Sequence, residues 1–428
     1  MLFLVAIAHL AVMPAPLPTG FQDSLPRITL AEALERATQL DPNYVSAVRQ
    51  IVDAAWGRRA AIAAFIVPSV TAQLSATQYS SAFFNIGTGE PASTIVDARL
   101  DGRLNLFSGL SKVAELQRTS AELEGARAGE LEARFTTALL TESDYYDVIA
   151  QRELTGVATE RVRRAREQLA VARARVLSGA AVQTDSLQLL LELTEARVAL
   201  LRQQARLTVA RYQLARRVGA PGPVDAVLDA TLTAQALPLT LDDAIREGVE
   251  LSPEAIGVRA SERAAEALVR SARGAYAPRV DLFGLVTATD ETFFPSAVTR
   301  SSVGVAVSLP IWNGAQREIA LSRATTTREV ARAYRADIEL ALRRDVVEAY
   351  EAYEAARATS ELAAQAVVVA SENLRVQQER YRAGATTIIE LITAQVSLSE
   401  AEAGLVQARY GTRLALSGLE AILGRRLF

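Results

Sequence analysis

The placement of proline constrains this chain most. All 14 prolines lie within residues 14–91 or 221–310, so two long tracts contain none. Proline in a helix interior costs roughly 3 kcal/mol, and both proline-free tracts are rich in the helix formers Ala, Leu, Glu, Arg and Gln. The tracts therefore predict two long helices and two return helices. Their expected positions are about 110–177, 184–218, 316–382 and 387–424.

Leucine recurs with heptad spacing along both return helices. The positions are Leu193, Leu200, Leu207 and Leu214, then Leu391, Leu398, Leu405 and Leu419, with Thr412 interrupting the second series. This spacing is typical of a coiled-coil seam, and ordinary packing between neighbouring helices explains these leucines. At a rise of 1.5 Å per residue, each long helix would span roughly 100 Å, which is too long for a compact domain.

The sequence also contains a tandem repeat. ITLAEALERATQLDP, which begins at Ile28, aligns with LTLDDAIREGVELSP, which begins at Leu239. Three glycines of the first half also match three of the second at one constant spacing, namely Gly109, Gly179 and Gly219 with Gly314, Gly384 and Gly424. We therefore expect two structural repeats, at 19–232 and 233–428. Residues 1–18 contain an apolar run followed by prolines, which predicts a secretory signal.

Four segments predict β-strands, two in each repeat. They lie at about 69–79, 95–107, 279–289 and 301–311. The alternation is clearest in the second segment, where Val96, Ala98 and Leu100 are separated by charged residues. Each segment is close to the ~9–11 residues of a strand that crosses a bilayer at a tilt. Amphipathic hairpins packed on the helices of a soluble protein would show the same pattern, so the strands alone leave both interpretations open.

A membrane location would require more than one copy of the chain. Open strand edges in lipid leave backbone groups unsatisfied at several kcal/mol each, so a spanning sheet must close. Barrels made by one chain begin at about eight strands. Four strands per chain therefore predict a homo-oligomer, with eight strands from a dimer or twelve from a trimer.

A change from strand to helix is expected once in each repeat. VSLPIWNGAQRE contains Asn313 and Gly314 at the change, and the earlier GRLNLFSGLSKV places Ser108 and Gly109 at the same positions. Glycine tolerates the unusual backbone angles that such a redirection can need. We therefore expect these four residues at the junctions between strands and long helices.

Residue types that carry most enzyme chemistry are scarce. The chain has no cysteine, and its single histidine, His9, lies within the expected signal. Neither a GxSxG motif nor a P-loop occurs. We expect neither enzymatic activity nor a metal or other cofactor. With a net charge of −3, the chain lacks the excess of basic residues that nucleic-acid-binding proteins use to bind phosphate.

Two segments resemble the signatures of a known family. RYRAGATTIIELITAQ, from Arg380, and its counterpart RVLSGAAVQTDSLQLLLE, from Arg175, together with SLPIWNGAQRE and the tandem repeat, resemble the TolC-like outer membrane efflux proteins. The resemblance implies a mainly α fold with membrane β-structure. Long antiparallel helices of the two repeats would form a trimeric α-barrel tunnel, and four strands per chain would contribute to a shared 12-stranded β-barrel.

The same resemblance implies a function and partners. The chain would be the exit duct of a tripartite efflux or type I secretion system, in the outer membrane of a Gram-negative bacterium and extending into the periplasm. A homotrimer would contact outer membrane lipid, a periplasmic adaptor (membrane fusion) protein and an inner-membrane pump of the RND, ABC or MFS type. The alternative is a soluble or peripheral periplasmic coiled-coil scaffold without a membrane barrel. The exported substrate stays open between drugs, metals, solvents and proteins.

The resemblance also assigns roles at the two distal turns. The tips that receive the adaptor would be Leu177, Ser178, Gly179 and Ala180, with Arg382, Ala383, Gly384 and Ala385. The periplasmic gate would consist of Glu390, Tyr381, Asp185 and Thr184. From the residues themselves, both glycines fit a left-handed helix C-cap, and Thr184 or Thr387 is able to cap the helix that follows.

Two positions depart from the family pattern. Thr386 stands where the best-known member has an arginine that latches the closed tip, and Thr393 stands where that member has the acid of a second ring. The resemblance therefore implies a weaker latch, with a ring of carboxylates only at Glu390.

Overall fold

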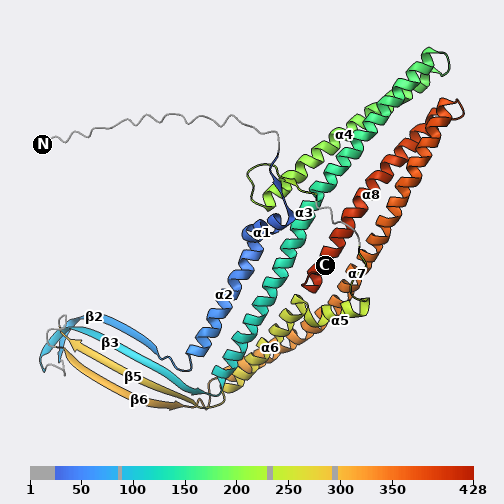
Figure 1. Ribbon diagram of the computed structural model, residues 1–428. Helices are drawn as coiled ribbons and strands as arrows, with labels where there is room; N and C mark the ends of the chain where they lie inside the picture. The colour runs from blue at the N-terminus through green and yellow to red at the C-terminus, as the bar shows by residue number, and fades with distance from the viewer. Residues whose placement is uncertain (1–24, 85–88, 229–234, 292–296) are drawn as a thin grey trace, which may run out of the picture.

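The computed structural model describes residues 25–84, 89–228, 235–291 and 297–428. The expected signal at 1–18 lies outside the described residues. A bundle of very long helices carries a four-stranded sheet at one end and two helical hairpin tips at the other (Figure 1). The fold is mainly helical with four antiparallel strands, as the sequence predicts.

The first repeat contains a short helix pair, two strands, a very long helix and a return helix. Its elements are α1 (Leu30–Leu40), α2 (Pro42–Ala63), β2 (Ser69–Phe84), β3 (Pro91–Ser108), α3 (Ser111–Leu177) and α4 (Gln183–Arg217). The second repeat has the same order. Its elements are α5 (Leu241–Leu251), α6 (Pro253–Gly274), β5 (Arg279–Asp290), β6 (Val298–Ser308), α7 (Gln316–Arg382) and α8 (Ile388–Leu423).

Local sequence explains where the shorter helices begin. Thr29 and Thr240 accept a hydrogen bond from the backbone three residues later and so cap α1 and α5. Asp41 and Ser252 do the same for α2 and α6, each followed by a proline in the first helical position. The same capping chemistry thus occurs in both repeats.

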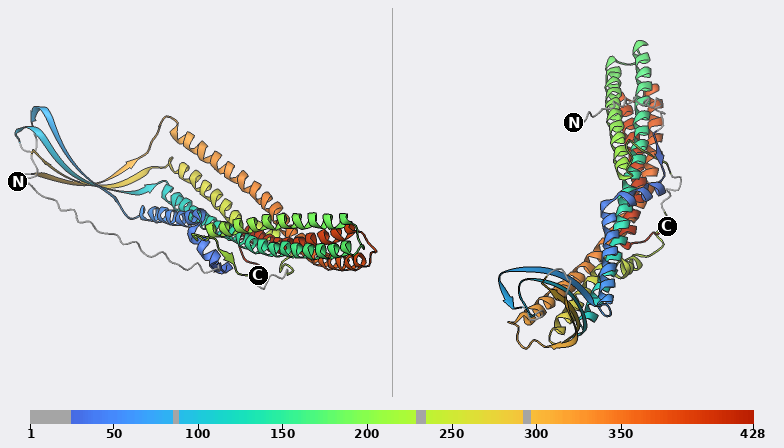
Figure 2. Two further views of the ribbon diagram at one scale, coloured as in Figure 1. Left: turned by 90° about the horizontal axis from the view of Figure 1, so that it is seen from above. Right: turned by 90° about the vertical axis from the view of Figure 1, so that its left-hand side faces the viewer.

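The long helices form one layer. In the half nearer the sheet, α2 packs on α3, α3 on α6, and α6 on α7. In the half nearer the tips, α4 packs on α3, α3 on α8, and α8 on α7. The end of α8 abuts the start of α6, since a Cβ on Gly424 would lie 2.6 Å from the ring of Pro253. Figure 2 shows α7 as one margin of this layer and α2 as the other.

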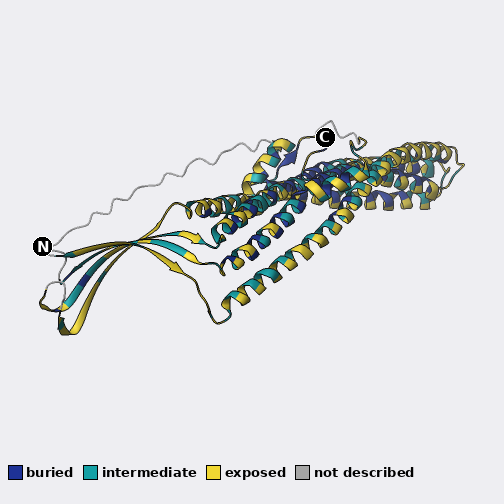
Figure 3. Ribbon diagram, turned by 90° about the horizontal axis from the view of Figure 1, so that it is seen from below, coloured by how far each residue is buried: buried dark blue, intermediate teal, exposed yellow. Residues whose placement is uncertain are grey.

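The sheet has the strand order β2–β3–β5–β6 and two chemically different faces. Leu100 is paired with Val286, and Leu282 with Val305, so these apolar side chains share one face. The opposite face carries polar pairs such as Gln73 with Arg99. Figure 3 shows burial concentrated where the helices pack, while much of the sheet is exposed.

Three of the four strands have bounds that differ from the sequence prediction by several residues, β6 beginning at Val298 rather than at 301. β2 and β3 have 16 and 18 residues, longer than expected, and extend as a paired ribbon with a register shift between Gln78 and Phe83. β6 ends at Ser308 rather than at 311. Pro310 has no N–H to donate to a ladder, which accounts for that earlier end.

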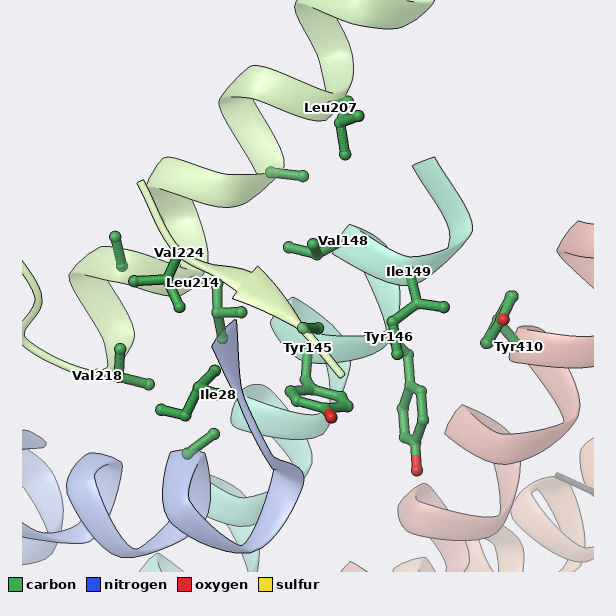
Figure 4. Packing of buried hydrophobic residues seen from close by; sticks show 14 of the residues in the cluster. Ile28, Tyr145, Tyr146, Val148, Ile149, Leu207, Leu214, Val218, Val224 and Tyr410 are labelled. Carbon is green, nitrogen blue, oxygen red and sulfur yellow. The ribbon is translucent and has the colours of Figure 1, made fainter. Parts of the chain in front are cut away.

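A small parallel sheet was not expected from the sequence. β1 (Arg27–Ile28) pairs with β4 (Asp225–Ala226) and lies against α3. Its Ile28 belongs to a buried cluster that also contains Tyr145, Tyr146 and Leu214 (Figure 4). Strands of two residues are too short to produce a periodic pattern. Within the described residues, no helix has both the length and the apolar character required to cross a membrane.

Candidate functional site

The two helical hairpins end in the same turn. Gly179 and Gly384 both adopt φ of +74°, the left-handed conformation expected for them. The N–H of Ala180 donates to the carbonyl of Arg175, and that of Ala385 to Arg380, at 2.8 Å in both cases. These bonds cap the ends of α3 and α7 in the Schellman geometry. The eight tip residues predicted to receive a partner, 177–180 and 382–385, are all exposed.

Tyr381 connects the second hairpin to the first. Its hydroxyl donates to Oδ2 of Asp185 at 3.3 Å, and its side chain is buried. Burial and the neighbouring carboxylate of Asp185 raise the pKa of the Tyr381 phenol. The phenol therefore stays protonated, and able to donate, at neutral pH. The structure thus brings together two of the four residues predicted for the gate.

Arg175 also contacts Tyr381. The sequence did not identify Arg175 as a residue of this site. Its guanidinium lies 4.8 Å from the centroid of the Tyr381 ring and donates a hydrogen bond to the Tyr381 carbonyl. It also donates to the carbonyl of Ala180 at 3.1 Å. The tandem repeat could have pointed to Arg175, because Arg380 is the equivalent residue of the second repeat. Arg380 makes the matching hydrogen bond to the carbonyl of Ala385, at 3.2 Å.

The remaining gate residues lie at the start of the return helices. Thr387 caps α8 by accepting from the N–H of Glu390 at 3.3 Å, as expected. Thr184 does not cap α4: the N-cap is Val182, which makes no side-chain hydrogen bond, and Thr184 lies exposed in the first turn. The N-cap Val182 lies two residues before Thr184, which places Thr184 inside the helix.

Glu390 is exposed in the first turn of α8. The hydroxyl of Thr386 donates to its carboxylate and lies 3.2 Å from Oε1 of Gln377. Thr393 is also exposed, one helical turn further along. Of these two positions on α8, only Glu390 carries a carboxylate. Within the described parts of the chain, no cluster of three or more His, Cys, Asp or Glu side chains could hold a metal ion.

The junctions between strand and long helix use two consecutive left-handed residues. Gly109 and Leu110 have φ of 62° and 64°, and Gly314 and Ala315 have φ of 68° and 63°. The preceding Ser108 is the last residue of β3, whereas Asn313 lies in the segment between β6 and α7, five residues after the end of β6. Ser108 Oγ lies 2.6 Å from the Ser111 hydroxyl. The sequence indicated the glycines, but not that the next residue would adopt the same strained conformation.

The two glycines differ in their surroundings. A Cβ on Gly109 would lie 2.1 Å from the carbonyl oxygen of Gly274, so α6 passes directly against this junction. A Cβ on Gly314 would have open space around it. Only the first junction therefore requires glycine for close packing as well as for its backbone angles.

Polar contacts also join the two repeats above the tips. Arg164 on α3 makes two bonds to Glu402 on α8, at 3.2 and 2.8 Å, and the Tyr410 hydroxyl donates to Glu153 at 2.7 Å. Burial and Glu153 raise the pKa of Tyr410. None of these pairs was predicted, because their members are far apart in the sequence.

The comparisons with known proteins agree with this geometry. The family model described as "Outer membrane efflux protein" matches residues 251–425. Outer membrane efflux protein BepC of Brucella suis is 24% identical over 351 residues, which cover 80% of this chain and 76% of BepC. The pyoverdine export outer membrane protein OpmQ of Pseudomonas putida is 26% identical over 347 residues, covering 78% of this chain and 70% of OpmQ.

Two solved structures share the fold. The outer membrane protein VceC of Vibrio cholerae superposes with a TM-score of 0.76 at 18% identity, covering 93% of this chain and 97% of VceC. A membrane protein of Pseudomonas aeruginosa reaches a TM-score of 0.79 at 18% identity, covering 92% of this chain and 93% of that protein.

Proposed function

The chain belongs to the TolC-like outer membrane efflux protein family, and from this premise we propose that three copies of it form the exit duct of a tripartite efflux or type I secretion system. As a member of this family it is an outer membrane efflux channel that extends into the periplasm, and not an enzyme. The periplasmic scaffold that the sequence left as an alternative does not fit this family.

The observation that carries the proposal is a pair of open margins. The sheet ends in β2 on one side and β6 on the other, and the helix layer ends in α2 and α4 on one side and α7 on the other. Unpaired strand edges in lipid are costly, so each must meet another strand. Contact of one copy's β6 margin with the next copy's β2 margin is head to tail, and such contacts close into a ring when the rotation from copy to copy divides a full turn.

Apolar side chains along both margins support this contact. α4 exposes Leu191 and Leu201, 59% and 66% exposed, and α7 exposes Leu362 and Val369, 64% and 70% exposed. Burying such side chains against a neighbouring copy is worth roughly 25 cal/mol per Å² of apolar surface. A dimer would supply eight strands and a trimer twelve. The long helices of three copies would then enclose a tunnel below a twelve-stranded barrel.

The tips supply the gate and the docking surface in this proposal. The contacts of Tyr381 with Asp185 and Arg175 hold α7 and α8 against α3 and α4, which keeps the tunnel narrow at its periplasmic end. Glu390 would place one carboxylate per copy at the narrowest level. The exposed residues 177–180 and 382–385 would receive the hairpins of an adaptor, which transmits opening from an inner-membrane pump.

Membrane fractionation and oligomer analysis test the proposal. The duct is expected to stay in the outer membrane after alkaline and high-salt washing. In mild detergent it is expected to run as a trimer and to conduct ions in planar bilayers. A chain released by alkaline washing as a water-soluble monomer would contradict the proposal. Replacing Leu362 and Val369 with Asp should reduce the trimer. Replacing the exposed Arg163 with Asp should not, because Arg163 lies on the middle helix α3 and pairs with Glu160 and Glu167 of the same helix.

A further inference from the structure

A groove lies between α3 and α6 just below the sheet. It has a volume of about 400 Å³ and is lined by Leu110 and Val113 on one side and by Arg270, Arg273 and Ala277 on the other. A second groove shares Gln117 and Arg270 with the first and continues along the same two helices. The first groove therefore combines apolar side chains with two arginines, whereas the second also contains Arg263, Glu124 and Glu266.

The two arginines are not neutralised by neighbours. Both are exposed, and within the described residues neither Arg270 nor Arg273 forms an ion pair or a side-chain hydrogen bond. Arg263, two turns earlier on α6, differs because it pairs with Glu124 at 2.8 Å. The end of the groove nearer the sheet therefore carries two positive charges that form no ion pair within the described residues, and the nearest acidic lining residue, Glu266, belongs to the second groove.

The groove opens on the outer face of the helix layer. Gln117 precedes Tyr145 by four heptads, so these two residues share one face of the long helix α3. On that face, the Tyr145 hydroxyl donates to the carbonyl of Val227 beside the β1–β4 sheet, at 2.5 Å. In the proposed ring, the face that carries the β1–β4 sheet is the outer face, and the opposite face lines the lumen. The groove therefore opens to the outside. The groove also lies between the two middle helices, away from the margins that meet other copies.

The apolar face of the sheet continues into this groove. Phe107 is paired with Val280 on the apolar face and is 39% exposed, and Leu110, three residues later, is 67% exposed. Beyond Leu110 the exposed surface of α3 and α6 becomes charged, with Arg270 and Arg273 as the first charges on the α6 side. In an embedded sheet, this change marks the boundary between the hydrocarbon layer and the periplasm.

We infer that the groove binds the anionic headgroup of a phospholipid from the periplasmic leaflet of the outer membrane. The guanidinium groups of Arg270 and Arg273 bind the phosphate, since arginine matches phosphate oxygens in a bidentate geometry. Leu110, Val113 and Ala277 contact the first part of the acyl chain. This inference rests on the proposed function, because it requires the sheet to lie in the membrane. A soluble anion would gain nothing from the apolar half of the groove.

Native mass spectrometry of the delipidated trimer tests this inference with two lipid probes. Each lipid is added back to the trimer, and the fraction of lipid-bound trimer is measured. Dioleoyl phosphatidylglycerol is expected to bind, and zwitterionic dioleoyl phosphatidylcholine is expected to bind more weakly. The double variant Arg270→Gln/Arg273→Gln should lower phosphatidylglycerol binding about tenfold or more, because each arginine near a membrane surface contributes roughly 1 kcal/mol. Arg263→Gln is the matched control and should bind as the parent does. Arg270→Lys/Arg273→Lys keeps the charge and should bind at an intermediate level.

Three results would overturn the inference. The first is unchanged phosphatidylglycerol binding in the double glutamine variant. The second is displacement of the lipid by inorganic phosphate at the same concentration, which indicates a site for free anions. The third is altered anion conductance in the double variant with unaltered lipid binding, which places the arginines in the lumen. Trimer formation and conductance of the parent protein in the same preparation report on the duct itself, so failure there is distinguishable from loss of lipid binding.

Discussion

The hydroxyl of Tyr381, near the end of α7, donates a hydrogen bond to Asp185, in the first turn of α4, at 3.3 Å. This bond joins the second repeat to the first at the end of the helices opposite the sheet (Figure 1). With the contacts of Arg175 on the same tyrosine, it fixes the position of one hairpin tip relative to the other.

Tyr381→Phe should loosen the tip without unfolding it. A hydrogen bond to a charged group contributes roughly 1.5–3 kcal/mol, and this one is only partly buried, so a loss of about 1 kcal/mol is expected. That loss corresponds to a roughly fivefold rise in the equilibrium constant for opening, read as a higher open probability in planar-bilayer recordings. Tyr212→Phe, at an exposed tyrosine of α4, is the control and should leave the recordings unchanged.

Glu390→Ala should reduce cation selectivity. Three carboxylates about 8 Å apart in a trimer would repel by roughly 2 kcal/mol per pair at an effective dielectric constant of 20, which favours cations between them. The expected result is a reversal potential closer to zero in a salt gradient, and weaker block by divalent cations. Glu400→Ala, at an exposed carboxylate of the same helix, should have a smaller effect. An unchanged current–voltage curve in Glu390→Ala would remove this residue from the gate.

Alanine should be far less tolerated at Gly109 than at Gly314, although both have φ near +65°. The left-handed conformation costs a residue with a side chain about 1–2 kcal/mol at either position. Only at Gly109 would the new Cβ also collide with the Gly274 carbonyl, at 2.1 Å. We expect Gly109→Ala to abolish most trimer assembly and Gly314→Ala to lower the Tm by a few degrees. Equal losses in the two variants would mean that backbone angles alone matter.

Arg426→Ala should destabilise the protein strongly. Its guanidinium bridges Glu142 and Glu420, at 2.6 Å to each, and both carboxylates are about 1% exposed or less. Removing one partner of a buried ion pair typically costs about 3–5 kcal/mol. Arg425→Ala breaks an exposed pair with Glu247 and should cost no more than about 1 kcal/mol. Thermal unfolding of the two variants in the same detergent measures the difference.

Glu254 should make stability depend on pH. Burial first, and then the nearby carboxylates of Glu132 and Asp345, raise the pKa of Glu254 in the folded protein. The folded state therefore binds this proton more tightly than the unfolded state, so the stability contribution is present below the ordinary pKa and is lost as pH rises through the raised pKa. Glu254→Gln should raise Tm slightly at pH 7 and flatten its dependence on pH above about 4.5. A steeper dependence in the variant would contradict this assignment.

The sequence by itself determined the architecture of this protein. Two proline-free tracts with heptad leucines specified the long helices, and alternation such as that from Val96 to Leu106 specified the strands. Both patterns can be found in the sequence because the residues on one face of a helix or strand recur at a fixed spacing. The repeated glycines located the turns and junctions for a different reason, because few other residues adopt those backbone angles.

Only the tertiary structure decided which side chains meet across the repeats. The contact of Arg175 with Tyr381, the bridge of Arg426 between Glu142 and Glu420, and the collision that Gly274 would impose at Gly109 each depend on how far one helix is shifted along another. A shift of one heptad, which is two helical turns, leaves the heptad pattern unchanged but exchanges every partner. Periodicity therefore cannot encode these pairs, and the packed helices fix them.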